Sequence, residues 1–518
     1  MHRNAPSPID AWRARHVNLR QSDLCRTITR TLSTRFSGRA IVCGVVVVYL
    51  GCASLAHAQA DLERFSRQLE QIQRDTLLQA NPDLSVDERV FIDYGGYATF
   101  GYLSVDDNVN QQHVLRQYEG IAYLRVNFDN AHEFFLRARG GWRDFNDGDS
   151  FDGRGDEAID FEFDRWFYRF DLQRYQAAYY GKVIDYNLII KGGRDLYIWG
   201  NGLVLSLDLQ GVDVAFDWGG NELELLAGIT PTRTVDFDAS RPNFDSNTKR
   251  GFYGAQLSRQ VGQHRPFIYG LVQRDYNTDD TLVTGPVVTE YDFNSYYLAV
   301  GSSGPIGDRI LYGVEAVYQG GTNLSNSFIS GGGPFITPIP QTEDDIRAWA
   351  LDARLDYLLP DERRRTRLSG EAIIASGDDD RGNTSNTFGG NAPNTTDNAF
   401  NAFGLINTGL AFAPQVSNLL ALRVGASTFP LPDTGPLRRL QIGTDLFIYN
   451  KFDPDAPIDE PSSDERYLGW EPDFYLNWQA TSDVTFALRY GVFFPNADAF
   501  NGDNTPRQYI YAGVTYAF

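Results

Sequence analysis

The chain has 518 residues, a formal net charge of -21 at pH 7 and a sequence pI of about 4.7. An acidic chain without a basic tail repels nucleic acid, which argues against nucleic-acid binding. The three cysteines, Cys25, Cys43 and Cys52, all lie near the N-terminus, so the rest of the chain has no disulfide and is not a small disulfide-stapled secreted fold.

Residues 1–58 are predicted to be an export signal with an extended N-terminal region. Arg35 and Arg39 precede the apolar run 40–55, and an Ala-His-Ala sequence at 56–58 forms a cleavage signal. A transmembrane helix needs about 20 apolar residues, and this run is shorter. The segment carries eight Lys/Arg and two Asp/Glu, so its removal leaves a chain of net charge -27.

Residues 59–89 are predicted to form a periplasmic helix and linker. Within 61–79, Leu62, Phe65, Leu69 and Ile72 recur at spacings that draw a narrow apolar stripe on a helix. The stripe suits docking onto a periplasmic export-scaffold partner, and it equally suits packing against the protein's own domain.

From residue 90 to 518 the pattern changes to strands of roughly 9 to 14 residues in which apolar and polar side chains alternate. The clearest is 348–357, where Trp349, Leu351 and Leu355 face one way and Asp352 and Arg354 the other. Six further segments follow the same rule: 118–128, 250–257, 310–318, 420–426, 440–448 and 484–494. About 19 such segments can be counted in this region, one of which we take to be a split strand or a misread loop.

Alternating strands suit either a soluble sandwich or a membrane barrel. Strands of a soluble sandwich are usually about 5 or 6 residues long, whereas transmembrane strands need about 9 to 11. The chain is also rich in aromatics, with 34 Phe, 28 Tyr and 8 Trp, which gather at strand ends as in an interfacial girdle. The fold class is therefore predicted to be all-β, a transmembrane antiparallel β-barrel in the bacterial outer membrane.

The end of the chain supports an outer-membrane address. Its final strand, QYIYAGVTYAF, alternates and stops on Phe518, which resembles the C-terminal assembly signal of bacterial outer-membrane barrels. About 430 residues accommodate 16 to 20 strands around an aqueous lumen. Both ends of the barrel should lie in the periplasm, so the number is even, and we predict 18.

If the apolar face of each strand contacts lipid, the polar face lines the lumen. The predicted pore-lining and substrate-binding residues are cations on these polar faces: Arg125, Arg137, Arg139, Arg143, Arg165, Arg169, Lys191, Arg194, Arg354, Arg367, Arg423 and Arg489. Acidic residues fall on the same faces in smaller number: Asp213, Glu315, Asp352, Asp356, Glu371, Asp445, Glu471 and Asp473. The remaining excess of acid belongs to loops such as 144–156 and 376–381.

Arginine in a lumen has two interpretations. A guanidinium is always charged and forks to carboxylates, so a lumen lined with it selects anions. The same arginines also suit ion pairs with lumen carboxylates that hold the barrel open. Arg137, Arg139 and Arg143 are adjacent on one face of the segment 134–143 and repel one another unless an anion lies between them.

Several short motifs resemble the alginate export family of outer-membrane barrels. The segment 467–494 and Pro495 carry a Leu-Gly-x-Glu-x-Asp strand and a Tyr-Gly-x-Phe-like strand end. Related stretches are ASGDD at 375–379, followed by Thr387 and Phe388, and Gly-Arg at 193–194 ahead of Trp-Gly-Asn-Gly at 199–202, where Asp195 and Asn201 replace the family's Gln and Asp. The matching positions are Gly193, Trp199, Gly200, Gly202, Ser376, Gly377, Asp378, Leu468, Gly469, Glu471, Asp473, Tyr490, Gly491, Phe493, Phe494 and Pro495.

The resemblance implies a monomeric 18-stranded barrel whose arginine-rich constriction exports an anionic exopolysaccharide, an alginate-like uronate polymer. Arg194 is the pore residue that the motif supports directly. The alternative is a passive anion- or oligosaccharide-selective porin for uptake. A loop folded into the lumen would favour gated export, and 378–400 is the candidate, although the same segment also suits an extracellular surface loop.

The sequence favours transport over catalysis. Beyond residue 58 the histidines are His113, His132 and His264, and no serine motif accompanies them, so no catalytic residues are predicted. No cofactor or metal site is predicted either, because the acidic residues of 147–152 lack the spacing of a calcium loop. The expected partners are outer-membrane lipid and an anionic polysaccharide, and not nucleic acid.

Overall fold

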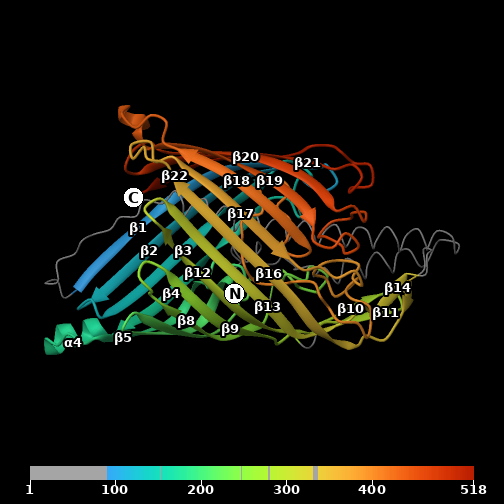
Figure 1. Cartoon of the computed structure of the whole chain (residues 1–518), viewed down its shortest axis with the longest axis horizontal. Helices are drawn as coiled ribbons and strands as arrows, with labels where there is room; N and C mark the ends of the chain where they lie inside the picture. Colours follow the sequence, from blue (N-terminus) through green and yellow to red (C-terminus); the bar gives the residue numbers. More distant parts are fainter. Residues whose placement is uncertain (1–89, 152, 247, 278–279, 331–335) are drawn as a thin grey trace, which may run out of the picture. The chain divides into compact units, whose positions relative to one another are not determined.

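The computed structural model describes residues 90–518, except 152, 247, 278–279 and 331–335 (Figure 1). The predicted signal 1–58 and the predicted helix 61–79 lie outside the described residues. The barrel and its loops belong to one compact unit, Leu55–Ile329 with Pro338–Phe518. A second unit, Met1–Ser54 with Ser330–Thr337, falls almost entirely outside the described part.

One closed antiparallel sheet contains 18 strands, as predicted (Figure 1). Its strands are β1 (Val90–Asp106), β2 (Gln112–Phe128), β3 (His132–Phe145), β4 (Glu157–Asp171), β5 (Tyr186–Ile198), β6 (Ser206–Trp218), β7 (Asn221–Ile229), β8 (Arg250–Arg259), β9 (Arg265–Asp275), β12 (Phe293–Ile306), β13 (Ile310–Leu324), β16 (Glu343–Leu358), β17 (Arg367–Ala375), β18 (Leu419–Thr428), β19 (Leu440–Lys451), β20 (Tyr467–Gln479), β21 (Val484–Pro495) and β22 (Arg507–Ala517). β1 pairs with β2 on one side and with β22 on the other, which closes the barrel. All seven strand segments predicted above fall within observed strands.

Short elements outside the barrel sheet were not predicted. They are β10 (Thr281–Thr284), β11 (Val287–Glu290), β14 (Phe328–Ser330), β15 (Ile336–Pro338), α4 (Leu172–Tyr180) and the 3₁₀ helix η1 (Gly435–Arg439). α4 is fixed by its caps: the Asp171 side chain accepts the backbone N–H of Arg174, and Gly181 closes the helix in the left-handed region with φ of 61°. None of the helices in the described residues has the length and apolar character to cross a bilayer.

Connections between consecutive barrel strands alternate between two rims. One rim, called here the turn rim, holds the short connections, α4, η1, the start of β1 and the end of β22 (Figure 1). The other, the loop rim, holds the longer connections, including β10 and β11 and the longest loop, residues 376–418 between β17 and β18. Short turns of outer-membrane barrels face the periplasm.

Successive residues point to opposite faces throughout the barrel, but near the loop rim the inner face is apolar as well as the outer one. On β3 the exposed residues are Phe134, Leu136 and Trp142, and the arginines lie on the other face, as predicted. On β12 both faces are apolar: Leu298 is 56% exposed, whereas its neighbour Tyr297 is fully buried inside the barrel. The assumption that the inner face is polar is therefore wrong here, because loops fold into the lumen and pack on it.

Candidate functional site in the barrel lumen

Seven of the predicted cations lie on the inner face of β2, β3, β4 and β5 and are called here the basic wall: Arg125, Arg137, Arg139, Arg143, Arg165, Arg169 and Lys191. The register aligns Arg125 of β2 with Phe135 of β3, and Arg137 of β3 with Arg165 of β4. Arg169 of β4 is in turn opposite Lys191 of β5. Since residues opposite one another in an antiparallel pair share a face, these cations form one contiguous inward surface.

Each arginine of β3 is paired with a carboxylate of β4. Arg137 binds Asp164 through two nitrogens, with Nε to Oδ1 at 3.0 Å, and Arg139 lies 3.3 Å from Glu162. Arg143 pairs with Glu157. These arginines therefore form ion pairs with carboxylates, and the carboxylates relieve the repulsion expected among three adjacent cations.

Irregularities in β4 create this pairing. The register between β3 and β4 shifts twice, between Arg137 and Ala138 and between Arg139 and Gly141. Each shift inserts an extra residue into β4, and the first of these is Asp164, whose carboxylate meets Arg137. A bulge re-aims a side chain in this way without breaking the sheet.

In several of these pairs the guanidinium is the more exposed partner. The Arg125 side chain is 42% exposed against 18% for Glu133, which lies 3.2 Å away, and Arg139 is 36% exposed against 20% for Glu162. Arg169 is likewise more exposed than Glu133. Arg143, Arg165 and Lys191 show the reverse order with Glu157, Asp208 and Asp195. Water in the lumen therefore contacts arginine side chains on β2, in the middle of β3 and at the turn-rim end of β4.

Arg194 lies apart from this wall. The unbroken register of β5 with β6 places it on the face opposite Lys191. β4 pairs with β5 only as far as Trp166 opposite Arg194, so Arg194 lies where the two strands part. Its guanidinium is 4.0 Å from Glu162, and its side chain is mostly buried. The structure does not bring this motif residue onto the surface formed by the other predicted cations.

The remaining predicted cations lie on the inner face of other strands. Arg367 of β17 is 2.7 Å from Asp356, and Arg423 of β18 is 2.8 Å from Glu371. Arg354 of β16 is exposed and has no ion pair within the described residues. Arg489 of β21 donates to the carbonyl oxygens of Leu476 and Leu488 at 3.2 and 3.0 Å.

Two loops from the loop rim cross the lumen. The first is the β5–β6 loop, 199–205, which carries the Trp-Gly-Asn-Gly motif. Its Asn201 donates its backbone N–H to Glu315 of β13 at 2.5 Å and its side-chain amide to Asp352 of β16 at 3.0 Å. β13 is separated from β6 by β7, β8, β9 and β12, so these bonds span the interior.

The second is the β17–β18 loop, 376–418, which pairs with the first inside the barrel. Phe403 forms a parallel bridge with Leu205, and the N–H of Leu405 donates to the carbonyl of Gly202 at 3.0 Å. The Tyr297 hydroxyl of β12 donates to the carbonyl of Asn401 at 2.6 Å. The two loops together form an internal septum, defined as residues 199–205 with 400–412.

The far end of the septum is held by the opposite side of the barrel. Glu471 of β20 accepts the backbone N–H groups of Leu410 and Ala411, each at 2.6 Å, and of Phe412 at 2.9 Å. The Phe412 ring stacks on Phe493 of β21 with centroids 4.2 Å apart. The segment 378–400, predicted as the inward plug, is adjacent in sequence to the residues that cross.

A buried ion cluster attaches a third loop, 230–249, to the same assembly. Arg250 and Arg241 bind Asp236 at 2.8 and 3.1 Å, and all three side chains are buried. Burial opposes ionisation of Asp236, but the guanidinium groups of Arg250 and Arg241 outweigh it and hold the pKa of its carboxyl below its ordinary value. From this loop Asp238 accepts the N–H of Thr387 at 2.9 Å, which joins it to the β17–β18 loop.

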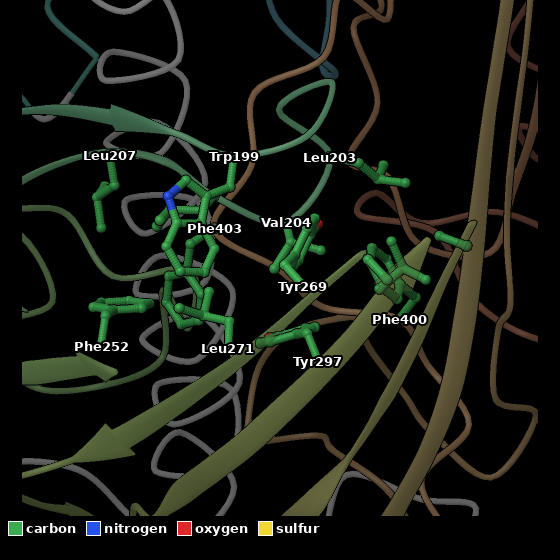
Figure 2. Packing of buried hydrophobic residues seen from close by; sticks show 14 of the residues in the cluster. Trp199, Leu203, Val204, Leu207, Phe252, Tyr269, Leu271, Tyr297, Phe400 and Phe403 are labelled. Atoms are coloured by element: carbon green, nitrogen blue, oxygen red, sulfur yellow. The ribbon is translucent and has the colours of Figure 1, made fainter. Parts of the chain in front are cut away.

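An apolar cluster inside the barrel packs around residues of the septum (Figure 2). Trp199 and Phe403 of the septum pack with Phe252, Tyr269 and Tyr297, which project from β8, β9 and β12. A solid core of this kind belongs to the interior of a soluble protein and not to a water-filled pore. The strands β2 to β5, which carry the basic wall, contribute only Tyr197 to this cluster.

Most of the positions that match the family motifs lie in the septum or contact residues that hold it in place. Gly200 has φ of +58°, and a Cβ there would lie 2.6 Å from the Glu315 carboxylate oxygens, so only glycine fits. A Cβ on Gly491 would lie 2.9 Å from Leu410. Ser376 donates its hydroxyl to the carbonyl of Asn398 at 2.7 Å. Burial is the largest influence on Asp378, and it raises the pKa of this carboxyl to about 6.

Sequence reasoning missed most of the residues that hold the septum. No motif or charge marks Tyr297, Asn401, Phe403 and Phe412. The same is true of Gln319 of β13, whose side-chain oxygen accepts the N–H of Asn401 at 2.9 Å. Phe403 and Phe412 lie in a segment, 400–413, that is more apolar than the rest of its loop. That run of apolar residues within a long loop is the one signal that could have indicated burial.

Asn201 offers a direct test of the septum. Replacing it with aspartate keeps its shape but sets a third carboxylate against Glu315 and Asp352. We expect the β5–β6 loop to leave its position and the single-channel conductance in planar bilayers to rise. Adding Asp352→Asn should restore the parent conductance, and equal conductance of the parent and Asn201→Asp proteins would contradict this assignment.

The chain resembles known proteins in sequence profile and, more distantly, in structure. The profile of the family described as alginate export matches residues 103–513. Comparison with curated proteins gives no match. Among solved structures the chain is similar to OccK8 (OprE) and OccK5 (OpdH) of Pseudomonas aeruginosa, at 13% and 12% identity with TM-scores of 0.48 and 0.47. It is similar to OccAB2 of Acinetobacter baumannii at 12% identity and a TM-score of 0.47; each match covers 82% of this chain and 98% of the other.

The family match spans most of the barrel, from within β1 to within β22. Together with the closed 18-stranded sheet and its apolar outer face, it assigns both the family and the compartment. The chain therefore belongs to the alginate export family and is a β-barrel of the bacterial outer membrane.

Proposed function

We propose that this barrel is an export pore for an anionic exopolysaccharide of the alginate type, a polymer of uronic acids, and that the polymer passes along the basic wall. The observation that carries the proposal is the exposure of guanidinium groups on β2, β3 and β4, where Arg125, Arg139 and Arg169 are more exposed than their carboxylate partners. The family's description as alginate export supports the choice of substrate.

Paired arginines remain able to bind a passing uronate. A guanidinium has five N–H donors, and a carboxylate partner uses at most two of them. The partner also holds the guanidinium in place, which lowers the entropic cost of binding. Because the partner carboxylates compete with the polymer, each contact stays weak, and conduction requires weak binding at many sites.

The septum suits this function because it crosses the lumen and so leaves less room for a passing chain. In the apolar cluster on the β8, β9 and β12 side, the polar atoms of Trp199, Tyr269 and Tyr297 already bond within the protein, so they are not available to a hydrated polymer. A periplasmic scaffold partner bound through 61–79 and a monomeric state remain predictions of the proposal.

Block of ionic current tests the proposal. Alginate oligomers added to a single open channel should interrupt the current, and neutral malto-oligosaccharides of equal length should not. Equal block by both sugars would instead identify a non-specific oligosaccharide porin. Passage of small anions without any block by alginate oligomers would identify an anion porin and overturn the export proposal.

A further inference from the structure

The turn rim carries a patch of exposed arginines that stands out in an acidic chain. Arg363, Arg364 and Arg365 lie in the turn between β16 and β17, and Arg438 and Arg439 lie in η1, between β18 and β19. All five are exposed. They are called here the rim patch.

The two turns are joined, so the patch is preorganised. The hydroxyls of Thr366 and Thr428 are hydrogen-bonded at 2.8 Å, and the N–H of Phe429 donates to the carbonyl of Arg364 at 2.8 Å. Arg365 has φ of +47°, a conformation that non-glycine residues rarely adopt, and its guanidinium lies over the Phe429 ring at 5.6 Å. Strain of this kind concentrates where function requires it.

Acidic neighbours do not neutralise the patch. Asp361 folds the first turn by accepting the N–H groups of Arg363 and Arg364 at 3.1 and 3.3 Å. Asp361 also lies 3.8 Å from the guanidinium of Arg364, and Asp433 lies 3.5 Å from Arg363, but these side chains are about half exposed or more, where an ion pair is weak. Arg365, Arg438 and Arg439 have no ion pair in the part of the chain that the structure describes.

The patch is continuous with the lumen. Arg367, the first residue of β17, follows it by two positions and lies on the inner face with its partner Asp356. Deeper along the same inner surface, the exposed Arg354 and the paired Arg423 flank Glu371 at one level. Arginines facing the lumen are shielded from lipid, so this series suits a ligand that enters the pore better than a lipid headgroup.

The opposite rim has the reverse charge. Exposed acidic residues cluster in its loops: Asp147, Asp379, Asp380, Asp455, Asp464, Glu465 and Asp498. A polyanion is therefore attracted at one mouth and repelled at the other. Fields of this kind change association rates strongly while contributing little to affinity.

We propose that the rim patch captures the anionic polysaccharide at the periplasmic mouth and that the charge difference between the rims makes capture one-sided. This inference rests on the proposed function and adds an entry site and a polarity to it. The polymer binds first to the patch through its carboxylates and is then passed to Arg367 and the lumen.

Sided block in planar bilayers tests the proposal on residues 59–518, the predicted exported chain, which has no native cysteine. Alginate oligomers are added to one rim at a time, and the orientation of each channel is fixed by an impermeant thiol reagent acting on Val183→Cys, an exposed position after α4. In the parent, the association rate from the turn rim should exceed that from the loop rim by about tenfold or more at low salt. Raising the ionic strength should reduce this difference.

Removing the patch should affect only one side. The variant with Arg363→Gln, Arg364→Gln, Arg438→Gln and Arg439→Gln should lose about tenfold in turn-rim association rate, while the loop-rim association rate stays as in the parent. A matched pair of double variants controls for net charge. Arg438→Gln with Arg439→Gln should reduce the rate more than Arg174→Gln in α4 with Lys182→Gln just after it, at the same rim.

The outcomes separate this inference from the proposed function. Block from neither rim would overturn the export proposal itself. Equal rates from both rims, or an unchanged turn-rim rate in the patch variant, would overturn the capture site while leaving the pore assignment intact. A patch effect confined to bilayers with anionic lipid would make the patch a lipid-binding surface and also overturn it.

Discussion

Replacing Glu471 with glutamine is expected to release the septum and produce a second, higher conductance level. The carboxylate accepts three consecutive backbone N–H groups, from Leu410, Ala411 and Phe412. A glutamine side chain turns its NH₂ group toward at least one of them, and an unsatisfied buried donor costs about 2 kcal/mol. That cost shifts the equilibrium between seated and released loop about thirtyfold. Single-channel recording measures the two populations directly.

Two further variants make this test specific. Tyr449→Phe removes the hydroxyl that donates to the carbonyl of Thr408 at 2.9 Å, so it should produce the same high level less often. Glu465→Gln removes an exposed carboxylate from the β19–β20 loop at the loop rim, and its single-channel recordings should match those of the parent. A Glu471→Gln channel with parent conductance and a folded barrel would show that the septum does not limit the current.

Neutralising the arginines of the basic wall, or instead their carboxylate partners, is expected to shift ion selectivity in opposite directions. Arg125→Gln with Arg139→Gln removes the two most exposed guanidinium groups of the wall and should lower the anion-to-cation permeability ratio. Each unit charge acts on a nearby hydrated ion with about 1 kcal/mol in water, or about fivefold in occupancy. Glu133→Gln with Glu162→Gln removes their carboxylate partners and should raise the ratio. Reversal potentials in a salt gradient measure both.

Arg137 should behave differently from its neighbours. Its partner Asp164 is almost completely buried, so Arg137→Ala leaves an uncompensated buried charge, which costs about 3–5 kcal/mol. Loss of barrel stability is expected to accompany any change in selectivity, and it should be recovered by adding Asp164→Asn. Cation selectivity in the parent channel would contradict the role assigned to the whole wall.

Much of the fold was predictable because a transmembrane strand obeys one local rule. Lipid on one side demands an apolar residue at every second position, and this period was sufficient to locate strands such as 118–128 and 484–494 within β2 and β21. The same rule placed Arg137, Arg139 and Arg143 on the face opposite Phe134 and Leu136. It failed for β12, where the inner face meets a protein core and is as apolar as the outer one.

The site was predictable only in part. Alternation found the cations of β2 to β4 and Lys191 of β5. Arg194, which both alternation and a motif predicted to line the pore, lies on the other face of its strand. The pairing of Arg137 with Asp164 depends on a bulge that no local pattern in β4 announces. The inward direction of the β17–β18 loop depends on contacts with β12, β20 and β21, which lie far from it in the sequence.

The sequence by itself therefore determined the barrel, its compartment, its strand number and most of the side chains that face inward. The repeat of two residues against lipid locates the strands and their faces, the length of the barrel region sets the strand number, and the final strand indicates the outer membrane. Only the tertiary structure decided what occupies the lumen. The septum, the apolar core against β8, β9 and β12, and the partners of Glu471 and Asn201 arise from contacts between distant segments, which no periodicity records.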